Sequence, residues 1–214
     1  MTRVADRQIP LSAPGEAARP SRRKVDILAA FLWAGLAVVR ITELLARPSL
    51  LQLGLAMFAV TIPLLFIIRR PTQAQGPRYA FWLAAFTTIF PTALLRPAPA
   101  GWALPGEVVQ FIGLGTILVA IWRLNRSFGI APAHRGLVTG GVYGLVRHPL
   151  YASELLSLAG YCIGYASVLN WLVFVATALA QVARIFAEER LLSEDGEYRT
   201  YQQRVRWRLL PGLW

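Results

Sequence analysis

Six long apolar runs dominate this sequence and restrict what it can fold into. A helix of about 20 apolar residues spans the hydrocarbon core of a bilayer, where backbone polar groups must bond within their own segment. With 56% hydrophobic and only 15% charged residues, the chain is not an ordinary soluble domain. We therefore predict an all-α polytopic membrane helix bundle, with spans at about 27–46, 50–68, 79–96, 106–123, 149–166 and 169–187.

The positions of arginine and lysine predict how these spans are oriented. Cytoplasmic connectors of membrane proteins are enriched in both residues. Most of them precede the first span, follow the second and fourth spans, or lie in the tail after the sixth. We therefore predict a multi-pass protein of the cytoplasmic membrane with both termini in the cytoplasm. The basic residues that give the net charge of +11 lie beside apolar runs. This position favours a role in membrane topology over nucleic-acid binding.

Composition divides the chain into three parts. Residues 1–24 are polar and rich in Pro, Ala and Arg, which predicts a disordered basic cytoplasmic tail. Residues 25–124 contain the first four predicted spans. Residues 125–214 contain the last two and a short amphipathic helix within 193–205. The single cysteine excludes an intrachain disulfide, and with two separated histidines it gives no metal-ligand spacing, so we expect no metal.

The glycine-rich stretch 136–151 is the first candidate for chemistry. It contains one of only two histidines, His148, beside Arg147. Pro149 fits the first turn of a helix, where its missing N–H would be unpaired anyway. We therefore expect Arg147 and His148 at the cytoplasmic mouth of the fifth span. A glycine-rich connector with basic flanks would explain the same stretch without any chemistry.

A second polar cluster lies near the cytoplasmic end of the sixth span. Arg184 and Glu188 are four residues apart and share one helical face, and Glu189 follows directly. Adjacent carboxylates at a membrane boundary need cationic or hydroxyl partners. Because the fifth and sixth spans are antiparallel neighbours, this cluster can face Arg147 and His148 across a pocket. The structural alternative is an intrahelical ion pair with an exposed Glu189.

Other residues within the spans also need a partner or a function. Glu154 lies about one turn beneath the mouth of the fifth span, where an unpaired carboxylate is costly. Arg40 and Glu43, three residues apart, are expected to pair with each other. Gly113 and Gly115 leave one face of the fourth span without bulky side chains. This permits either close helix packing or access by a cofactor.

Three blocks of residues in order carry a resemblance to a known family. They are Leu137–Thr139 with Gly141–Tyr143 and Arg147–Tyr151, then Arg184 with Glu188–Glu189, then Gly196–Tyr198 with Tyr201, Val205 and Pro211. Because of these blocks, residues 125–211 resemble the isoprenylcysteine carboxyl methyltransferases. That family belongs to the wider group of membrane phospholipid and isoprenylcysteine methyltransferases, and the resemblance is to its prokaryotic-type members. In two departures, the segment between Glu189 and Gly196 is one residue short, and Arg135 stands where eukaryotic members tend to have histidine.

The resemblance implies S-adenosyl-L-methionine as the methyl donor. It places the cofactor against Arg135, Gly136, Leu137, Val138, Tyr143, His148, Pro149, Leu150, Tyr151, Glu188 and Glu189. It assigns the methyl acceptor to Arg184, and the position of Glu154 adds that residue to the substrate side. Arg184, Glu188 and His148 are the residues expected to act in catalysis. Gly113–Gly115 also resembles the glycine pair that phospholipid methyltransferases combine with a Glu-Glu motif.

The predicted activity is methylation of a lipophilic small molecule or lipid that enters from the bilayer. Carboxyl O-methylation is the first expectation, and phospholipid amine or small thiol methylation is the alternative. Membrane lipids are the expected surroundings, with no nucleic acid or metal as partner. A small transporter or membrane scaffold is the alternative without catalysis. A transporter would place its charges near the midplane, whereas most charges here gather at the predicted cytoplasmic edge.

Overall fold

The computed structural model describes residues 20–46, 48, 50–68, 74–75, 102–124, 127, 133–134 and 137–214, with scattered residues between 79 and 96. Its α-helices are α1 (Pro20–Ala46), α2 (Leu50–Ile68), α4 (Ala103–Leu124), α5 (Pro149–Gly164), α6 (Val168–Leu192) and α7 (Gly196–Arg204). Between Tyr79 and Leu94, the described residues are helical too. The helical class is confirmed. Helix α1 begins at Pro20 and so includes the last residues of the predicted tail.

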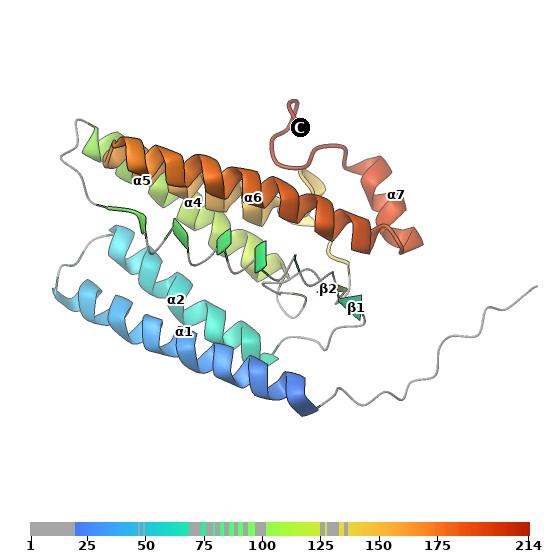
Figure 1. The fold of residues 1–214 in the computed structure, drawn as a ribbon, viewed down its shortest axis with the longest axis horizontal. Helices are drawn as coiled ribbons and strands as arrows, with labels where there is room; N and C mark the ends of the chain where they lie inside the picture. Colours follow the sequence, from blue (N-terminus) through green and yellow to red (C-terminus); the bar gives the residue numbers. More distant parts are fainter. Residues whose placement is uncertain are drawn as a thin grey trace, which may run out of the picture.

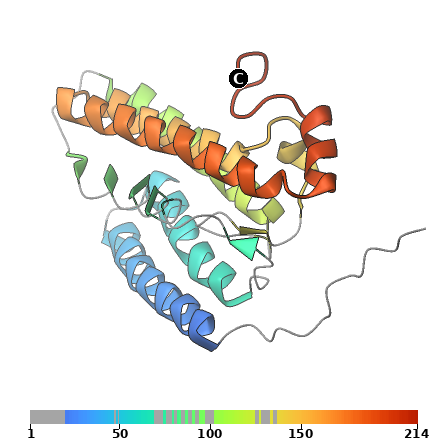
Figure 2. The ribbon, with the colours of Figure 1, turned by 45° about the vertical axis from the view of Figure 1, so that its right-hand side comes forward.

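The long helices form two layers of roughly aligned rods. Helix α1 packs against α2, α2 against α4, α4 against α5, and α5 against α6. The α1–α2 pair forms one layer and α4, α5 and α6 the other (Figure 1, Figure 2). We call the end of the bundle that carries α7 the α7 end. There α2, α4 and α6 finish and α5 begins, so polar residues from distant parts of the sequence can meet.

A small strand pair departs from the all-α prediction. Strand β1 (Ala74–Gln75) runs antiparallel to β2 (Ala133–His134), with Ala74 opposite His134. Strand β1 follows α2 in the chain and β2 follows α4, and both strands lie at the α7 end (Figure 1). Connectors brought together in this way can satisfy each other's backbone groups. The pairing therefore follows from the alternating direction of the helices, not from a β-strand pattern.

The buried apolar core connects five helices. It contains the side chains of Ala30, Ile62, Leu65, Phe66, Ile117, Ala120, Ile121, Leu150, Tyr151 and Ile185. Leu150 and Tyr151 are at the first turn of α5 and are the last two residues of the glycine-rich stretch 136–151. The core and this stretch are therefore joined at the start of α5. On α1, Arg40 donates to Glu43 at 2.6 Å, as the three-residue spacing predicted.

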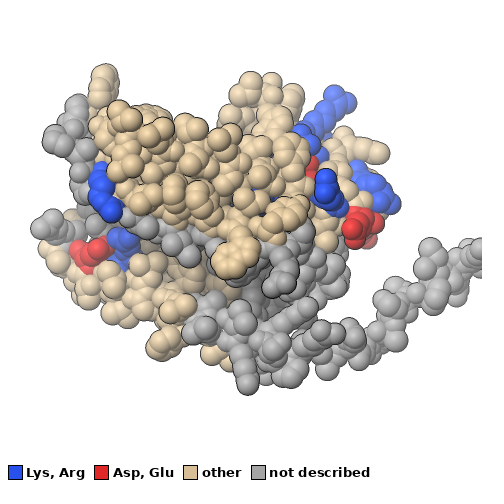
Figure 3. Space-filling view, viewed as in Figure 1, with Lys and Arg blue, Asp and Glu red and all other residues tan. Residues whose placement is uncertain are grey.

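The exterior of the bundle is apolar. Among the described residues, α4 and α6 are long and apolar enough to cross a membrane, and 33% of the most apolar window of each is buried. Trp122 and Leu179 on these helices are 69% and 67% exposed, which is costly in water. Charged side chains gather at the two ends of the bundle and leave an uncharged belt between them (Figure 3). Helices α1, α2 and α5 occupy predicted spans, but their membrane crossing stays a prediction.

Candidate functional site

The mouth of α5 is joined to the C-terminal segment. Pro149 is the first residue of α5 and His148 is its N-cap, as the missing N–H of proline predicted. The backbone N–H of Arg147 donates to the carbonyl of Trp207 at 2.8 Å, and that of His148 to the carbonyl of Arg208 at 2.9 Å. The last residues of the chain therefore fix the backbone of the predicted cofactor-binding turn.

Glu189 joins two arginines and a histidine in one buried cluster. Its Oε1 lies 3.2 Å from Arg147 Nε and 3.2 Å from His148 Nε2, and its Oε2 accepts from Arg208 Nε at 2.9 Å. The guanidinium of Arg208 also lies against the rings of Phe186 and Trp214. Since both oxygens are engaged, Glu189 holds the mouth of α5, the end of α6 and the C-terminal segment together.

Glu188, the next residue, reaches α5 instead. Its Oε2 accepts a hydrogen bond from the Tyr151 hydroxyl at 2.6 Å. The Tyr151 ring stacks on the His148 ring, with centroids 5.4 Å apart and planes 4° apart. Among the described residues, none donates to Oε1 of Glu188. That oxygen remains an acceptor beside a buried aromatic pair.

Arg184 is buried one turn deeper on α6. Its guanidinium carbon lies 4.6 Å from the centroid of the Tyr151 ring, and its Nη1 donates to Thr87 Oγ1 at 3.0 Å. Gln181, one turn further along, lies 3.5 Å from the same nitrogen and donates to Glu154 of α5. Glu154 thereby has a partner within the bundle. The polar side chains continue from the mouth into the interior between α5 and α6.

Tyr143 and Tyr201 connect the 3-10 turn Gly141–Gly144 to α7. The Tyr201 hydroxyl donates to the backbone carbonyl of Tyr143 at 2.6 Å. Burial raises the pKa of Tyr201 to about 12 and that of Tyr143 well above its ordinary value, so both phenols stay protonated near neutral pH. Tyr198, Tyr201 and Val205 are buried with Leu137 packed against them. The apolar face of α7, predicted as amphipathic, therefore packs against the protein itself.

Most of the predicted site residues meet at the α7 end. Leu137 and Val138 precede the 3-10 turn and are half-buried. The other described site residues lie on that turn, at the start of α5, or on the side of α6 that faces α5. Arg135 and Gly136 are outside the described residues. The structural alternative was an intrahelical ion pair between Arg184 and Glu188. The two side chains have separate partners instead, since Glu188 bonds to Tyr151 and Arg184 bonds to Thr87.

Sequence reasoning missed three members of this cluster. Gln181 precedes Arg184 by three residues and Glu188 by seven, so its helical spacing was an available signal. Arg208 lies after the amphipathic segment 193–205 and Thr87 lies within an apolar run, and neither position gave a signal. Within the described part of the chain, no group of three or more His, Cys, Asp or Glu residues could hold a metal ion.

Gly113 and Gly115 differ in their surroundings. A Cβ added at Gly113 would overlap the backbone of Ser157 on α5, so this glycine permits close helix packing. A Cβ added at Gly115 would meet nothing within 4 Å. Close packing thus explains Gly113, while a cofactor contact for Gly115 stays a prediction.

Fold and site together define a helical bundle with an apolar exterior and a polar cluster enclosed at one end. Residues 102–198 match the phospholipid methyltransferase family. That region begins just before α4 and ends within α7, so it includes the described part of the cluster except Thr87 and Arg208. The 7-dehydrocholesterol reductase of Xenopus laevis is 32% identical over 81 residues, which cover 36% of this chain and 17% of that protein.

Proposed function

We propose that this protein is an integral-membrane methyltransferase that uses S-adenosyl-L-methionine and methylates a lipophilic acceptor. The observation that carries the proposal is the polar seam between α5 and α6, in which Glu188 bonds to Tyr151 and Arg184 lies against the same ring. This seam lies within the region similar to phospholipid methyltransferases. Methyltransferase chemistry is thus supported both by the family and by the arrangement of side chains.

The residues present fit part of such a cofactor. S-adenosyl-L-methionine supplies an electrophilic methyl group on a sulfonium, and its ammonium and ribose hydroxyls need hydrogen-bond acceptors. Oε1 of Glu188 provides an acceptor beside the stacked rings of His148 and Tyr151. Pro149 and Leu150, in the same first turn of α5, are also buried and would help to keep water out. Glu189 would act by positioning the first turn of α5, since its oxygens already contact Arg147, His148 and Arg208.

Arg184 is suited to hold the acceptor. Its planar guanidinium can grip a carboxylate with two parallel hydrogen bonds, and its burial makes that contact stronger than in water. For a carboxylate acceptor, the bound cofactor would supply the methyl group as an electrophile and leave as a neutral thioether, and Arg184 would hold the acceptor oxygen. No proton is transferred, so no general base is required. The chain's part is to orient the acceptor in line and exclude water.

Carboxyl O-methylation, as in isoprenylcysteine carboxyl methyltransferases, is the substrate class that Arg184 favours. A phospholipid amine or a small thiol would have to lose a proton, and Glu154, which accepts a hydrogen bond from Gln181 in this seam, is a candidate to receive it. The match to a 7-dehydrocholesterol reductase supports a second candidate, reduction of a lipophilic substrate. Such a reduction would need a hydride donor, for which a reduced nicotinamide dinucleotide is a general choice. That match covers 17% of the reductase, so the family similarity favours methyl transfer.

Calorimetric titration of the detergent-purified chain tests the proposal. We expect binding of S-adenosyl-L-methionine and S-adenosylhomocysteine, and no binding of the reduced nicotinamide dinucleotides. A folded sample that binds only a nicotinamide dinucleotide would establish the reductase alternative. A folded sample that binds neither would favour a transporter or scaffold.

The proposed membrane orientation has its own test. In a Cys162→Ala background, Ala166→Cys lies between α5 and α6 at the end opposite α7, and Glu194→Cys lies at the α7 end. In sealed right-side-out vesicles, an impermeant thiol reagent should label position 166 and not position 194. The reverse pattern would place the α7 end outside and contradict a cytoplasmic site.

A further inference from the structure

A hollow lies on the surface of the α7 end. It has a volume of about 330 Å³ and lies between the 3-10 turn and the segment that follows α7. Arg204 and Arg206 line it together with Leu145, Trp207 and Pro211. None of these residues belongs to the candidate cofactor or acceptor site.

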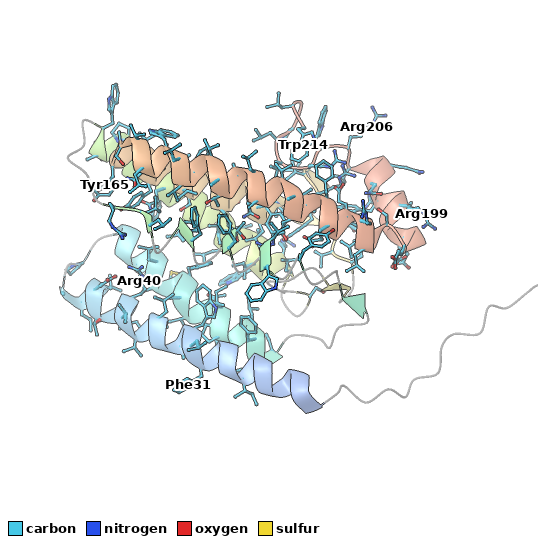
Figure 4. All side chains as sticks on the ribbon, viewed as in Figure 1. Phe31, Arg40, Tyr165, Arg199, Arg206 and Trp214 are labelled. Atoms are coloured by element: carbon cyan, nitrogen blue, oxygen red, sulfur yellow. The ribbon has the colours of Figure 1, made fainter. Side chains whose placement is uncertain are left out.

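The charge of this hollow is positive and uncompensated. Arg204 and Arg206 are exposed, and among the described residues neither forms an ion pair with a carboxylate. Arg206 lies at the same end of the bundle as Trp214 (Figure 4). The backbone carbonyl of Arg206 accepts from Arg147 Nη2 at 3.4 Å, so its position is fixed while its own guanidinium remains available. An anion is the complementary ligand.

The rim of the hollow is apolar and exposed. Leu145 is 65% exposed and Trp207 37% exposed, and both line the hollow. Leu210 and Leu213 follow in the same C-terminal segment and are 53% and 75% exposed. Exposed leucine and tryptophan in the hollow and in the segment that continues from it would be costly in water. Beside two arginines, they match the boundary between acyl chains and phosphates.

We propose that this hollow binds the phosphate headgroup of an anionic phospholipid in the surrounding membrane. The phosphate would lie between Arg204 and Arg206, while the acyl chains would cover Leu145, Leu210 and Leu213. A free phosphate would use only the arginines and leave the apolar rim uncovered, so the lipid is the better match. The lipid is held here without reacting.

Binding at this hollow would also stabilise the mouth of α5. Trp207 lines the hollow with its side chain, and its backbone carbonyl accepts from the N–H of Arg147. A bound headgroup that orders residues 204–207 would therefore order the turn before His148. The hollow would thus connect the membrane environment to the candidate site without sharing a lining residue with it.

Native mass spectrometry of the full chain in a neutral detergent tests this binding. We expect dioleoylphosphatidylglycerol to bind more tightly than zwitterionic dioleoylphosphatidylcholine, and glycerol 3-phosphate to show no binding at the same concentrations. Arg206→Gln should weaken binding of the anionic lipid about fivefold, the loss expected for one basic residue at a membrane surface. Arg190→Gln is the matched control, since Arg190 is an exposed arginine at the end of α6 outside the hollow.

Several outcomes would overturn the proposal. Equal losses in Arg206→Gln and Arg190→Gln would mean a diffuse charge effect and no site. Equal affinity for the two lipids would show that the arginines do not select the anionic headgroup. Glycerol 3-phosphate binding as tightly as the lipid would define a site for a free phosphate. If circular dichroism shows that Arg206→Gln is misfolded, Arg204→Gln carries the same expectation.

Discussion

Helix α5 meets its two neighbours in opposite ways. Against α4 it uses glycines: a Cβ added at Gly106 would overlap Gly164, and one added at Gly160 would overlap the backbone of Gln110. Against α6 it uses polar side chains, among them Tyr151 bonded to Glu188. One helix therefore carries a face of close backbone contact and a face of functional groups.

The difference teaches how a small membrane-type bundle can hold a polar site. Apolar side chains gain little by leaving lipid for another helix, so close packing between small residues is the main attraction available to α4 and α5. Once that pair is rigid, α6 can stand further away and place arginine and glutamate in the seam. Substitutions on the packing face should therefore lower stability, while those on the polar face should act on binding and turnover.

Substitution of Gly160 by leucine should have the largest effect. The new side chain would overlap the backbone of Gln110, and neither helix can move without opening the α4–α5 contact. We expect a loss of about 3 kcal/mol or more in the free energy of unfolding, measured by thermal or denaturant unfolding in detergent. Gly115→Ala is the control, because nothing lies within 4 Å of its added Cβ. Equal losses in both variants would show that the glycine contact is unimportant.

Substitution of Glu189 by glutamine should destabilise the α7 end. The change leaves Arg147, Arg208 and His148 around a neutral amide, and removal of one partner from a buried ion pair costs about 3 kcal/mol or more. The free energy of unfolding should fall by about that amount. A variant with unchanged stability but lost cofactor binding would assign Glu189 to the cofactor, against the positioning role.

Substitution of Glu188 by glutamine should affect binding more than stability. The amide oxygen can still accept from Tyr151, but the charge is lost, at a cost of about 1.5–3 kcal/mol in affinity for S-adenosyl-L-methionine. Isothermal titration of both variants at Glu188 and Glu189 measures the contrast. If Glu188→Gln bound the cofactor normally, the free oxygen of Glu188 would have no part in the site.

Substitution of Arg184 by lysine should impair turnover and spare cofactor binding. Lysine keeps the charge but loses the planar fork and the broad contact with the Tyr151 ring. We expect a loss of about 2 kcal/mol in transition-state stabilisation, on the order of 30-fold in kcat/KM. Normal turnover with lower stability would instead make Arg184 a structural residue of the seam.

Substitution of Tyr201 by phenylalanine should have the smallest effect. It removes the hydrogen bond to the Tyr143 carbonyl, which contributes about 1 kcal/mol near neutral pH. Burial raises the pKa of Tyr201 from 10.0 to about 12, so the native protein keeps this proton longer than the unfolded chain does. The stability contributed by the phenol is therefore complete below pH 10 and declines as the pH rises toward 12. Chemical unfolding at several pH values should show the gap between the two proteins narrowing over that interval, and a gap that widened would contradict the assignment.

Local sequence signals predicted the local elements well. Apolar runs predicted the positions of the long helices, Pro149 predicted the start of α5, and Arg40 and Glu43 predicted their own pairing. Asp195 caps α7 by accepting from the N–H of Glu197, within the segment predicted as a short helix. Each of these features depends on residues within about one helical turn, so the sequence carries the whole signal.

The sequence alone determined the helical class, the polar stretch before α5, and the acidic pair at the end of α6. Only the tertiary structure decided what the neighbours Glu188 and Glu189 do. Consecutive residues on a helix point about 100° apart, so one reaches Tyr151 on α5 and the other reaches Arg208 beyond α7. Thr87 met Arg184, and Glu154 met Gln181, in the same way, through contacts between different helices. Such contacts depend on how helices pack and not on neighbouring residues, which is why the chain's pattern could not specify them.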